Sequence, residues 1–482
     1  MRICQLAAEV TPYAKTGGLG DVVAGLSRHL GQSGHEVMVF LPAYAHLARR
    51  EETFVPVEPL QNVPLQMGSR SYTFSVVTTS LPESEVPVYF IDCPALYGWE
   101  GIYQGDWNDW LRFGALTRAA FECCQRLGFA PDIVHGHDWH TALAPLYLKS
   151  LYSWDRLFDA TRSVLTVHNM GFQGLAASTV LDDLGLSHHG FWLDAADSLA
   201  GRFNFLKTGL LHADAITAVS RTYAQEIQTP ELGFGLDWLA RARSSRLFGI
   251  VNGVDYGTWS PETDPHIPHH YSAADLAGKR RMKSALLAAV GLEETDAPVV
   301  GIVSRLTPQK GFDLCFDVLP EALAQRDLRL VVLGSGEDRY QDFFQWLMWR
   351  FPTKAWYYKG YNEELAHWIE AGADVFLMPS RYEPCGLNQM YSLRYGTPPI
   401  VRKTGGLADT VELVDSATGQ GTGFVFDHFD PGGLAWALHY ALDTYPDKTV
   451  WNRLVQNGMA QDFSWAVQGE QYEELYRRLT GG

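Results

Sequence analysis

The chain has 482 residues, of which 46% are hydrophobic and 19% charged, so it is long enough for two domains and has the composition of an ordinary globular protein rather than a disordered or fibrous one. The formal net charge of −17 argues against nucleic acid or an anionic membrane as a partner, because both require an electropositive surface. No apolar stretch is long enough to span a bilayer, and the residues leave the oligomeric state open.

The six cysteines are scattered and include no CxxC pair, which is typical of free thiols in a reducing compartment. Residues 1–12 lack the charged and apolar layout of a signal segment and resemble a strand instead. We therefore expect a cytoplasmic protein.

In the first half, short β-branched runs alternate with longer amphipathic runs. We expect helices that include residues 21–34 and 115–128, and buried strands at residues 2–9, 36–42, 86–93, 132–138, 163–169 and 215–220. This alternation predicts a doubly wound α/β domain.

The pattern stops in residues 252–272, where Pro, Gly, His and Asp predict a linker or a surface excursion. The alternation then restarts, with helices that include residues 311–325 and 362–372, and strands at 299–306, 329–336, 355–361, 375–380, 398–405 and 423–427. The second half is therefore expected to be a second doubly wound domain.

Small and charged residues follow the expected strands, at the edge where open parallel sheets bind ligands. They lie in KTGGLGD (15–21), HGHDWH (135–140), TVHNMGFQG (166–174), SRLTPQKGFDL (304–314), LGSGED (333–338), SRYEPCGLNQ (380–389) and RKTGGLADT (402–410). Glycines at a helix entrance let backbone N–H groups approach a phosphate, and Lys15, Arg305 and Lys310 supply positive charge. Together these motifs predict a diphosphate-binding site.

Each motif alone also has a purely structural explanation. A glycine pair before a helix usually makes a turn, and KTGGLGD does not have the GxGxxG spacing of a dinucleotide site. His135, His137 and His140 lack a clear set of carboxylate or thiolate ligands, and the sequence contains no DxD triplet. We therefore expect no metal site.

The motifs occur in order through nearly the whole chain. KTGGLGDVVAGL, HDWHTALAP, TVHNMGFQG, FNFLKTGLLHADAITAVS, VNGVDYGTWSP, SRLTPQKGFDL and SRYEPCGLNQMYSLRYGTPPIVRKTGGLADTV resemble the bacterial glycogen synthases and plant starch synthases of glycosyltransferase family 5. The resemblance implies the GT-B fold, in which two Rossmann-like domains face each other across a deep cleft. It implies an acceptor-side domain at residues 1–251, completed by a C-terminal helix at 462–482 that crosses back to it, and a nucleotide-sugar-binding domain at 252–461.

The resemblance implies retaining transfer of glucose from ADP-glucose to the non-reducing end of an α-1,4-glucan such as glycogen, without a cofactor or metal. Two alternatives stay open: another GT-B transferase that uses UDP-glucose, and a non-catalytic glucan-binding protein. Enzymes that make sucrose phosphate or trehalose phosphate typically carry a second glutamate eight residues after the first, where this chain has Tyr391.

The resemblance also implies roles for individual residues. Glu383 and His168 would flank the transferred sugar, and Arg305 and Lys310 would neutralise the phosphates. The implied substrate-binding residues are Lys15, Gly17, Gly18, Asp21, Asp138, Asn169, Tyr361, Cys385, Gly386, Leu387, Thr404, Gly405 and Gly406.

Overall fold

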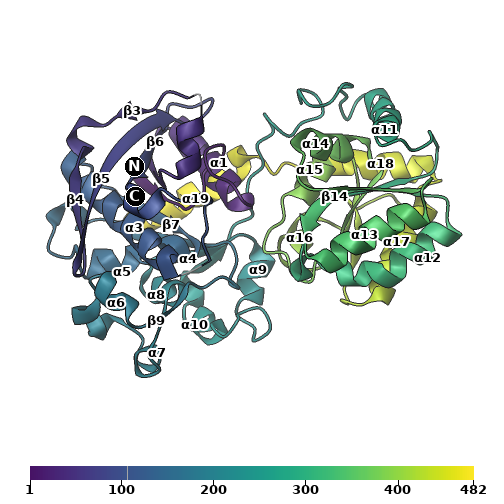
Figure 1. Cartoon of the computed structure of the whole chain (residues 1–482). Coiled ribbons are helices and arrows are strands. Elements are labelled where there is room, and N and C mark those ends of the chain that lie inside the picture. The colour runs from purple at the N-terminus through teal and green to yellow at the C-terminus, as the bar shows by residue number, and fades with distance from the viewer. Residues whose placement is uncertain (51, 106, 482) are drawn as a thin grey trace. The chain divides into compact units, whose positions relative to one another are not determined.

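The computed structural model describes residues 1–50, 52–105 and 107–481, which divide into two units. Unit 1 consists of Met1–Gly253 and Trp465–Gly482, and unit 2 of Val254–Ser464. Each unit is an open sheet with helices packed on it (Figure 1).

The main sheet of unit 1 is mixed. Its strands are β1 (Arg2–Leu6), β2 (Glu36–Pro42), β3 (Val55–Pro56), β4 (Val63–Met67), β5 (Arg70–Ser80), β6 (Pro87–Asp92), β7 (Ile133–His137), β8 (Arg162–Val167), β11 (Ala215–Ala218) and β12 (Leu247–Gly249). They run in the order β12-β11-β8-β7-β1-β2-β6-β5-β3, with β4 paired to β5. The pairs from β12 to β6 are parallel, whereas β5 is antiparallel to β6, β3 and β4. A separate antiparallel pair joins β9 (Leu175–Ala177) to β10 (Arg202–Asn204).

Most helices of unit 1 connect these strands in the sequence. They are α1 (Gly18–Gln32), α2 (Pro94–Tyr97), α3 (Trp107–Leu127), α4 (Asp138–Thr141), α5 (Ala144–Lys149), α6 (Val180–Asp183), α7 (Ala195–Leu199), α8 (Phe205–His212), α9 (Arg221–Glu226), α10 (Asp237–Ala242) and α19 (Trp465–Thr480). Short 3₁₀ helices occupy Ala45–Arg49, Glu58–Leu60, Arg156–Phe158, Ser187–Trp192 and Ser244–Arg246.

Unit 2 has an entirely parallel sheet in the order β15-β14-β13-β16-β17-β18. Its strands are β13 (Val299–Leu306), β14 (Arg329–Gly336), β15 (Ala355–Lys359), β16 (Val375–Met378), β17 (Pro399–Arg402) and β18 (Phe424–Phe426). Its helices are α11 (Ala277–Ala289), α12 (Cys315–Gln325), α13 (Asp338–Arg350), α14 (Glu363–Gly372), α15 (Asn388–Arg394), α16 (Gly405–Thr410), α17 (Pro431–Thr444) and α18 (Lys448–Met459), with 3₁₀ helices at Pro308–Lys310 and Phe312–Leu314.

The parallel strands of both sheets are buried on their two faces. Side chains alternate along a strand, so Ile3 of β1 packs into one apolar cluster while Cys4 and Leu6 pack into another. In β13, Val299 and Val300 are divided between two clusters in the same way. Helices must therefore cover both faces, which explains why the parallel strands are continuous β-branched runs in the sequence.

The predicted doubly wound architecture is confirmed in both units. Strands β2, β13 and β14 begin and end at the predicted residues. The antiparallel strands β3, β4 and β5 at the edge of unit 1 were not predicted, although the alternation of Phe74 and Val76 with polar residues in β5 is typical of a half-buried strand.

Helix α19 packs on unit 1, beside α1 (Figure 1). Trp465, Tyr472 and Tyr476 enter the same apolar cluster as the buried face of α1. Two glycines permit this close approach, because a Cβ at Gly25 would lie 2.0 Å from the Trp465 indole nitrogen and a Cβ at Gly469 would lie 2.1 Å from the His29 ring.

All six cysteines lie in the described part of the chain, where they are buried and unbridged. Among the described helices, none combines the length and apolarity needed to cross a membrane.

Replacing Gly25 by Ala tests the contact between α1 and α19. Alanine improves helix propensity by about 0.5–1 kcal/mol, but overpacking against a buried indole costs about 1–3 kcal/mol, so we expect a net loss of stability. Calorimetric unfolding should show a lower midpoint for unit 1. Gly190→Ala is the matched control, since nothing lies within 4 Å of its added Cβ. An unchanged or higher midpoint in Gly25→Ala would contradict the packing.

Candidate functional site

A partly buried ion pair lies at the carboxyl edge of the unit 2 sheet. Glu383, in the loop after β16, is 5% exposed, and its Oε2 lies 2.6 Å from Nζ of Lys310 in the loop after β13. The Ser380 hydroxyl donates to the same oxygen at 3.0 Å. A buried carboxylate is stable only when it is paired and hydrogen-bonded, and both conditions are met here.

The glycines that begin α16 pack against the backbone of the Glu383 loop. The Gly406 N–H donates to the carbonyl oxygens of Glu383 at 3.1 Å and Pro384 at 3.2 Å. Gly405 has a φ of +45°, and a Cβ there would lie 1.8 Å from the Glu383 carbonyl oxygen. These glycines are therefore required by the close approach of two loops, and Thr404 precedes them as the N-cap residue of α16.

Gln389 in α15 holds the turn that follows Glu383. Its side-chain amide donates to the carbonyl oxygens of Cys385 at 3.1 Å and Gly386 at 3.0 Å. Gly386 has a φ of +75°, a conformation that favours glycine, and Leu387 is the N-cap residue of α15. Cys385 is buried, so its side chain packs inside this loop.

The two remaining predicted residues of unit 2 lie near strand ends on the surface. Arg305 is the exposed second-last residue of β13, and Tyr361 follows β15 with 72% of its surface exposed. The structure thus brings Lys310, Glu383 and the glycines of α16 together, and leaves Arg305 and Tyr361 at the periphery of the same edge.

In unit 1, the loop before α1 is organised by two carboxylates. Lys15 Nζ lies 2.8 Å from Asp21 Oδ1, which also accepts a hydrogen bond from the Thr11 hydroxyl at 2.9 Å. Glu9 is 3% exposed and accepts hydrogen bonds from the Thr16 hydroxyl at 2.7 Å and the Gly17 N–H at 3.2 Å. The loop that carries Lys15 is therefore fixed from its interior side.

Gly17 has neither of the usual structural reasons to be glycine. Its φ of −161° is extended backbone that any residue adopts, and a Cβ there would meet no atom within 4 Å. Gly18 follows it as the first residue of α1. The open space at Gly17 argues against the interpretation of this motif as a mere turn.

Asp138 connects the ends of the neighbouring strands β7 and β8. Its Oδ1 accepts hydrogen bonds from the backbone N–H groups of His168 at 2.7 Å and Asn169 at 3.3 Å. Its φ of +56° is uncommon for a residue other than glycine and stores local strain, a feature that clusters at functional sites. Burial raises the pKa of Asp138 to about 7.

His168 is held by a second histidine. Its Nε2 lies 3.0 Å from Nδ1 of His137, whose Nε2 lies 3.0 Å from the Gln5 side-chain oxygen. That oxygen only accepts, so His137 donates to it from Nε2 and accepts the His168 Nε2–H at Nδ1. Burial lowers the pKa of His168 to about 3, so its ring is neutral at pH 7 with a lone pair on Nδ1.

The other histidines of the HGHDWH motif are structural. His135 is hydrogen-bonded to the Tyr476 hydroxyl at 2.7 Å and the Thr166 hydroxyl at 2.6 Å. His140 packs against the rings of Tyr103 and Phe113, with centroids 5.0 and 4.7 Å away. Both ring nitrogens of His135 and His137 have protein partners, so hydrogen bonding within the fold accounts for these two histidines.

Three residues that support the candidate site were not predicted from the sequence, namely Glu9, Ser380 and Gln389. Each acts through a contact that only the folded chain creates. Of the three, only Glu9 could have been noticed in the sequence, because it is a single carboxylate at the end of the predicted strand 2–9.

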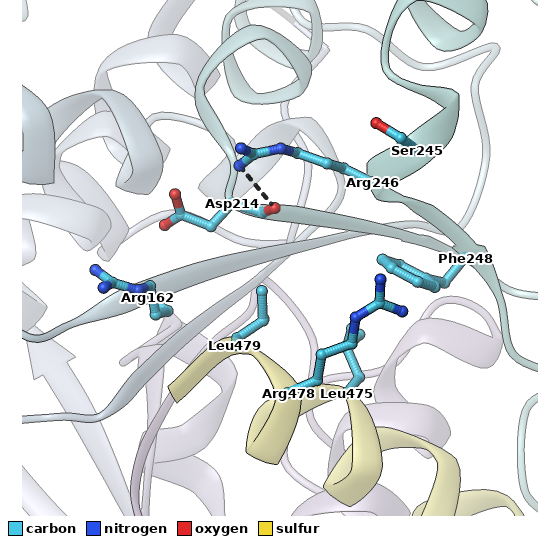
Figure 2. A pocket seen from close by; sticks show the side chains of 8 residues that line it. All are labelled: Arg162, Asp214, Ser245, Arg246, Phe248, Leu475, Arg478 and Leu479. Carbon is cyan, nitrogen blue, oxygen red and sulfur yellow. Dashed lines mark hydrogen bonds between the residues drawn. The ribbon is translucent and has the colours of Figure 1, made fainter. Parts of the chain in front are cut away.

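A pocket of about 440 Å³ lies at the opposite, amino edge of the unit 1 sheet (Figure 2). Figure 2 shows Arg246 directed toward the backbone carbonyl of Asp214, to which it donates a hydrogen bond at 3.3 Å. The pocket is lined by Arg162, Asp214, Ser245, Arg246, Phe248, Leu475, Arg478 and Leu479, none of which is a predicted site residue. It is therefore separate from the loops at the carboxyl ends of the strands.

Two family models match the chain. The model described as "Starch synthase catalytic domain" matches residues 2–242, and the model described as "Glycosyl transferases group 1" matches residues 286–458. The first match covers the unit 1 sheet except for strand β12, and the second covers the whole unit 2 sheet.

Curated relatives are similar over the full length. A glycogen synthase of Koribacter versatilis is 45% identical, over 99% of this chain and 98% of the relative. A glycogen synthase of Streptococcus sanguinis is 42% identical, over 99% and 100% respectively.

Solved structures agree with these relatives. The catalytic domain of starch synthase IV from Arabidopsis thaliana, bound to ADP and acarbose, matches with a TM-score of 0.91 and 36% identity, over 100% of this chain and 99% of that one. Sucrose-phosphate synthase from Thermosynechococcus elongatus matches with a TM-score of 0.63 and 16% identity over the same shares, which supports the fold alone.

The buried histidines predict how the stability of unit 1 depends on pH. Burial lowers the pKa of His135 and His140 to about 3 and holds the pKa of His137 well below its usual value. Between pH 6.5 and 3 the unfolded state therefore binds protons that the folded state excludes, and stability falls as the pH falls. Asp138 acts in the opposite direction between pH 3.8 and 7, but one carboxyl is outweighed by four imidazoles, because burial also lowers the pKa of His168 to about 3.

We expect the unfolding midpoint of unit 1 to fall steadily below about pH 6. The variant His140→Gln removes one of the titrating groups, so it should reduce the slope of the unfolding free energy against pH by about 1.4 kcal/mol per pH unit. Calorimetric scans from pH 4 to 8 measure it. His188→Gln, at an exposed histidine, is the control and should leave the slope unchanged. Equal slopes for all three proteins would refute the assignment.

Proposed function

The chain belongs to the starch and glycogen synthase family, glycosyltransferase family 5, and from this premise we propose that it transfers glucose from ADP-glucose to the non-reducing end of an α-1,4-glucan, with release of ADP and retention at the anomeric carbon. Family membership makes it a glycosyltransferase of glycogen biosynthesis with the GT-B fold. The proposed compartment is the cytoplasm, a choice that the six unbridged thiols support.

The donor and the acceptor are proposed by chemical analogy with the relatives. The Arabidopsis starch synthase structure holds ADP, which supports adenine over uracil in the donor. Its acarbose is an oligosaccharide analogue, which supports a glucan as the acceptor. The donor-binding role of unit 2 and the acceptor-side role of unit 1 are part of the same proposal.

The ion pair of Lys310 with Glu383 is the observation that carries the proposal. When the bond between glucose and diphosphate breaks, negative charge develops on the diphosphate and positive charge on the sugar ring. Lys310 would stabilise the negative charge on the diphosphate, and Glu383 would stabilise the positive charge on the sugar. The two side chains already lie 2.6 Å apart, so they need not be brought into position during the reaction. Arg305 would add a second positive charge at the phosphates.

In unit 1, Lys15 would bind the donor through its ammonium group, held in place by Asp21 at 2.8 Å. The open space at Gly17 lets a sugar or phosphate approach the backbone, which a side chain at this position would block. Gly18 would contribute an N–H at the positive end of the α1 dipole.

His168 would accept a hydrogen bond from a sugar hydroxyl. The neutral ring has its Nδ1 lone pair available because Nε2–H is directed to His137. Asp138 would fix the backbone of His168 and Asn169 from the acceptor side, through the two N–H groups that it already binds.

The remaining residues would line the donor pocket through their backbone or lie at its border. The backbone of Cys385, Gly386 and Leu387 would contact the sugar, and Thr404, Gly405 and Gly406 would lie at the phosphates. The Gly406 N–H is already bonded to the Glu383 loop, so its role is to hold that loop. Tyr361 would lie near the base.

In the proposed step, the acceptor 4-hydroxyl attacks the anomeric carbon from the face that the diphosphate leaves. The new C–O bond forms as the bond to the diphosphate breaks, and the departing phosphate oxygen takes the hydroxyl proton. The pairing of Glu383 with Lys310 makes this carboxylate a weaker nucleophile, which favours its electrostatic role over a covalent intermediate.

Release of nucleotide from ADP-glucose and UDP-glucose, each with and without glycogen and with chelator present, tests the reaction. We expect primer-dependent release of ADP that survives chelation, because lysine and arginine provide the charge that a metal supplies elsewhere. Dominant release of UDP would overturn the donor assignment. Glycogen binding without release from either donor would favour a non-catalytic glucan-binding protein.

Replacing Lys310 by Ala should lower kcat about 10²- to 10³-fold, because it removes a charge that stabilises the transition state. Arg350→Ala, which removes an exposed cation at the end of α13, should leave kcat unchanged. Initial rates at saturating ADP-glucose and glycogen measure both variants. A kcat within threefold of the parent in Lys310→Ala would contradict the proposed role.

A further inference from the structure

A second cluster of titratable side chains lies in unit 2, apart from the Glu383 loop. It consists of His266, Glu363 and His367, whose ligand atoms all lie within 4.8 Å of one another. His266 comes from the irregular segment before α11, whereas Glu363 and His367 are four residues apart on α14 and share one face of that helix. Two imidazoles and a carboxylate from separate segments of the chain converge here.

His367 is oriented as a metal ligand would be. Its Nδ1 lies 2.7 Å from Oδ2 of Asp264, so the proton resides on Nδ1 and Nε2 has the lone pair. The side chain is fully buried, and Nε2 has no hydrogen-bond partner among the described residues. A carboxylate on the far nitrogen is the usual support of a metal-binding histidine.

The unpartnered Nε2 requires an explanation, because a buried polar atom without a partner costs about 1–3 kcal/mol. The ring is also held firmly, since Trp259 stacks on it with centroids 3.8 Å apart and planes at 9°. The ring therefore cannot turn its lone pair toward solvent without disrupting both the stack and the bond to Asp264. A cation between the three side chains would satisfy it.

We propose that His266 and His367, through imidazole nitrogen, and Glu363, through a carboxylate oxygen, bind one Zn²⁺ ion, with water in the fourth position. Two nitrogens and one oxygen are a typical zinc ligand set, whereas Mg²⁺ and Ca²⁺ prefer oxygen ligands alone. The site uses none of the residues assigned to glucosyl transfer, so it is independent of the proposed function.

The ion would connect the irregular segment before α11, which contains His266, to helix α14 of unit 2. Trp259 stacks on His367 from one side and on Tyr391 of α15 from the other, with centroids 4.0 Å apart in the second pair. Asp264 also accepts a hydrogen bond from Tyr395, the C-cap residue of α15. Helix α15 follows the Glu383 loop directly, so zinc would stabilise the support of that loop without entering the reaction.

Zinc binding is measured on the full-length protein, which is first dialysed against a chelator and then dialysed again to remove the chelator. Competition with a chromophoric zinc chelator should give one site of micromolar or tighter affinity, and Zn²⁺ should raise the unfolding midpoint of unit 2 by linkage. With Co²⁺ in place of Zn²⁺, the visible spectrum should show the absorption bands of a four-coordinate ion with nitrogen and oxygen ligands.

The variants His266→Ala and Glu363→Gln change partly or fully exposed side chains, so the fold should survive. Each should weaken zinc affinity at least about tenfold and abolish the cobalt bands. His269→Ala and Glu364→Gln, at neighbouring positions of the same two segments, are the matched controls and should bind like the parent. Absence of a site in the parent, or equal affinity in all four variants, would overturn the proposal.

Discussion

Parallel pairing of strands is the constraint on which the rest of this protein depends. It directs the carboxyl ends of neighbouring strands to one edge, where the connecting loops meet. In unit 1 this places Asp138, after β7, against the backbone of His168, after β8. In unit 2 it places the Glu383 loop, after β16, against Gly405, after β17. In each cluster, strand pairing in the sheet is sufficient to bring together residues that are 20 or more positions apart in the sequence.

Charge is organised locally against a strongly negative background. The chain carries a formal charge of −17, yet both edges hold a lysine paired to a carboxylate, Lys15 with Asp21 and Lys310 with Glu383. These pairs orient the ammonium groups in advance, which lowers the cost of ordering them around an anionic donor. Lys310 is the more strongly constrained of the two lysines, because its carboxylate partner is buried whereas Asp21 is partly exposed.

The sequence predicted most of the parallel strands because strands buried on both faces are continuous apolar runs, as in β2, β13 and β14. It did not predict β3 to β5, because a strand with one polar face is not a continuous apolar run and is harder to recognise in a sequence. Family resemblance implied Lys310 and Glu383 as site residues, but the hydrogen bond of Ser380 to Glu383 depends on a tertiary contact that no spacing encodes. The same holds for the hydrogen bond of His168 to His137, which determines the tautomer and hence the chemistry of the ring.

The sequence KTGGL occurs twice, at residues 15–19 and 403–407, and the two copies differ in physical role. In the second copy, Gly405 has a left-handed φ and touches the Glu383 carbonyl, so glycine is required by packing. In the first copy, Gly17 is extended and faces open space, so neither packing nor conformation requires glycine. Glycine is also favoured at an N-cap, the position that Gly17 occupies before α1, and the open space there supports the proposal that the donor approaches the backbone at this residue.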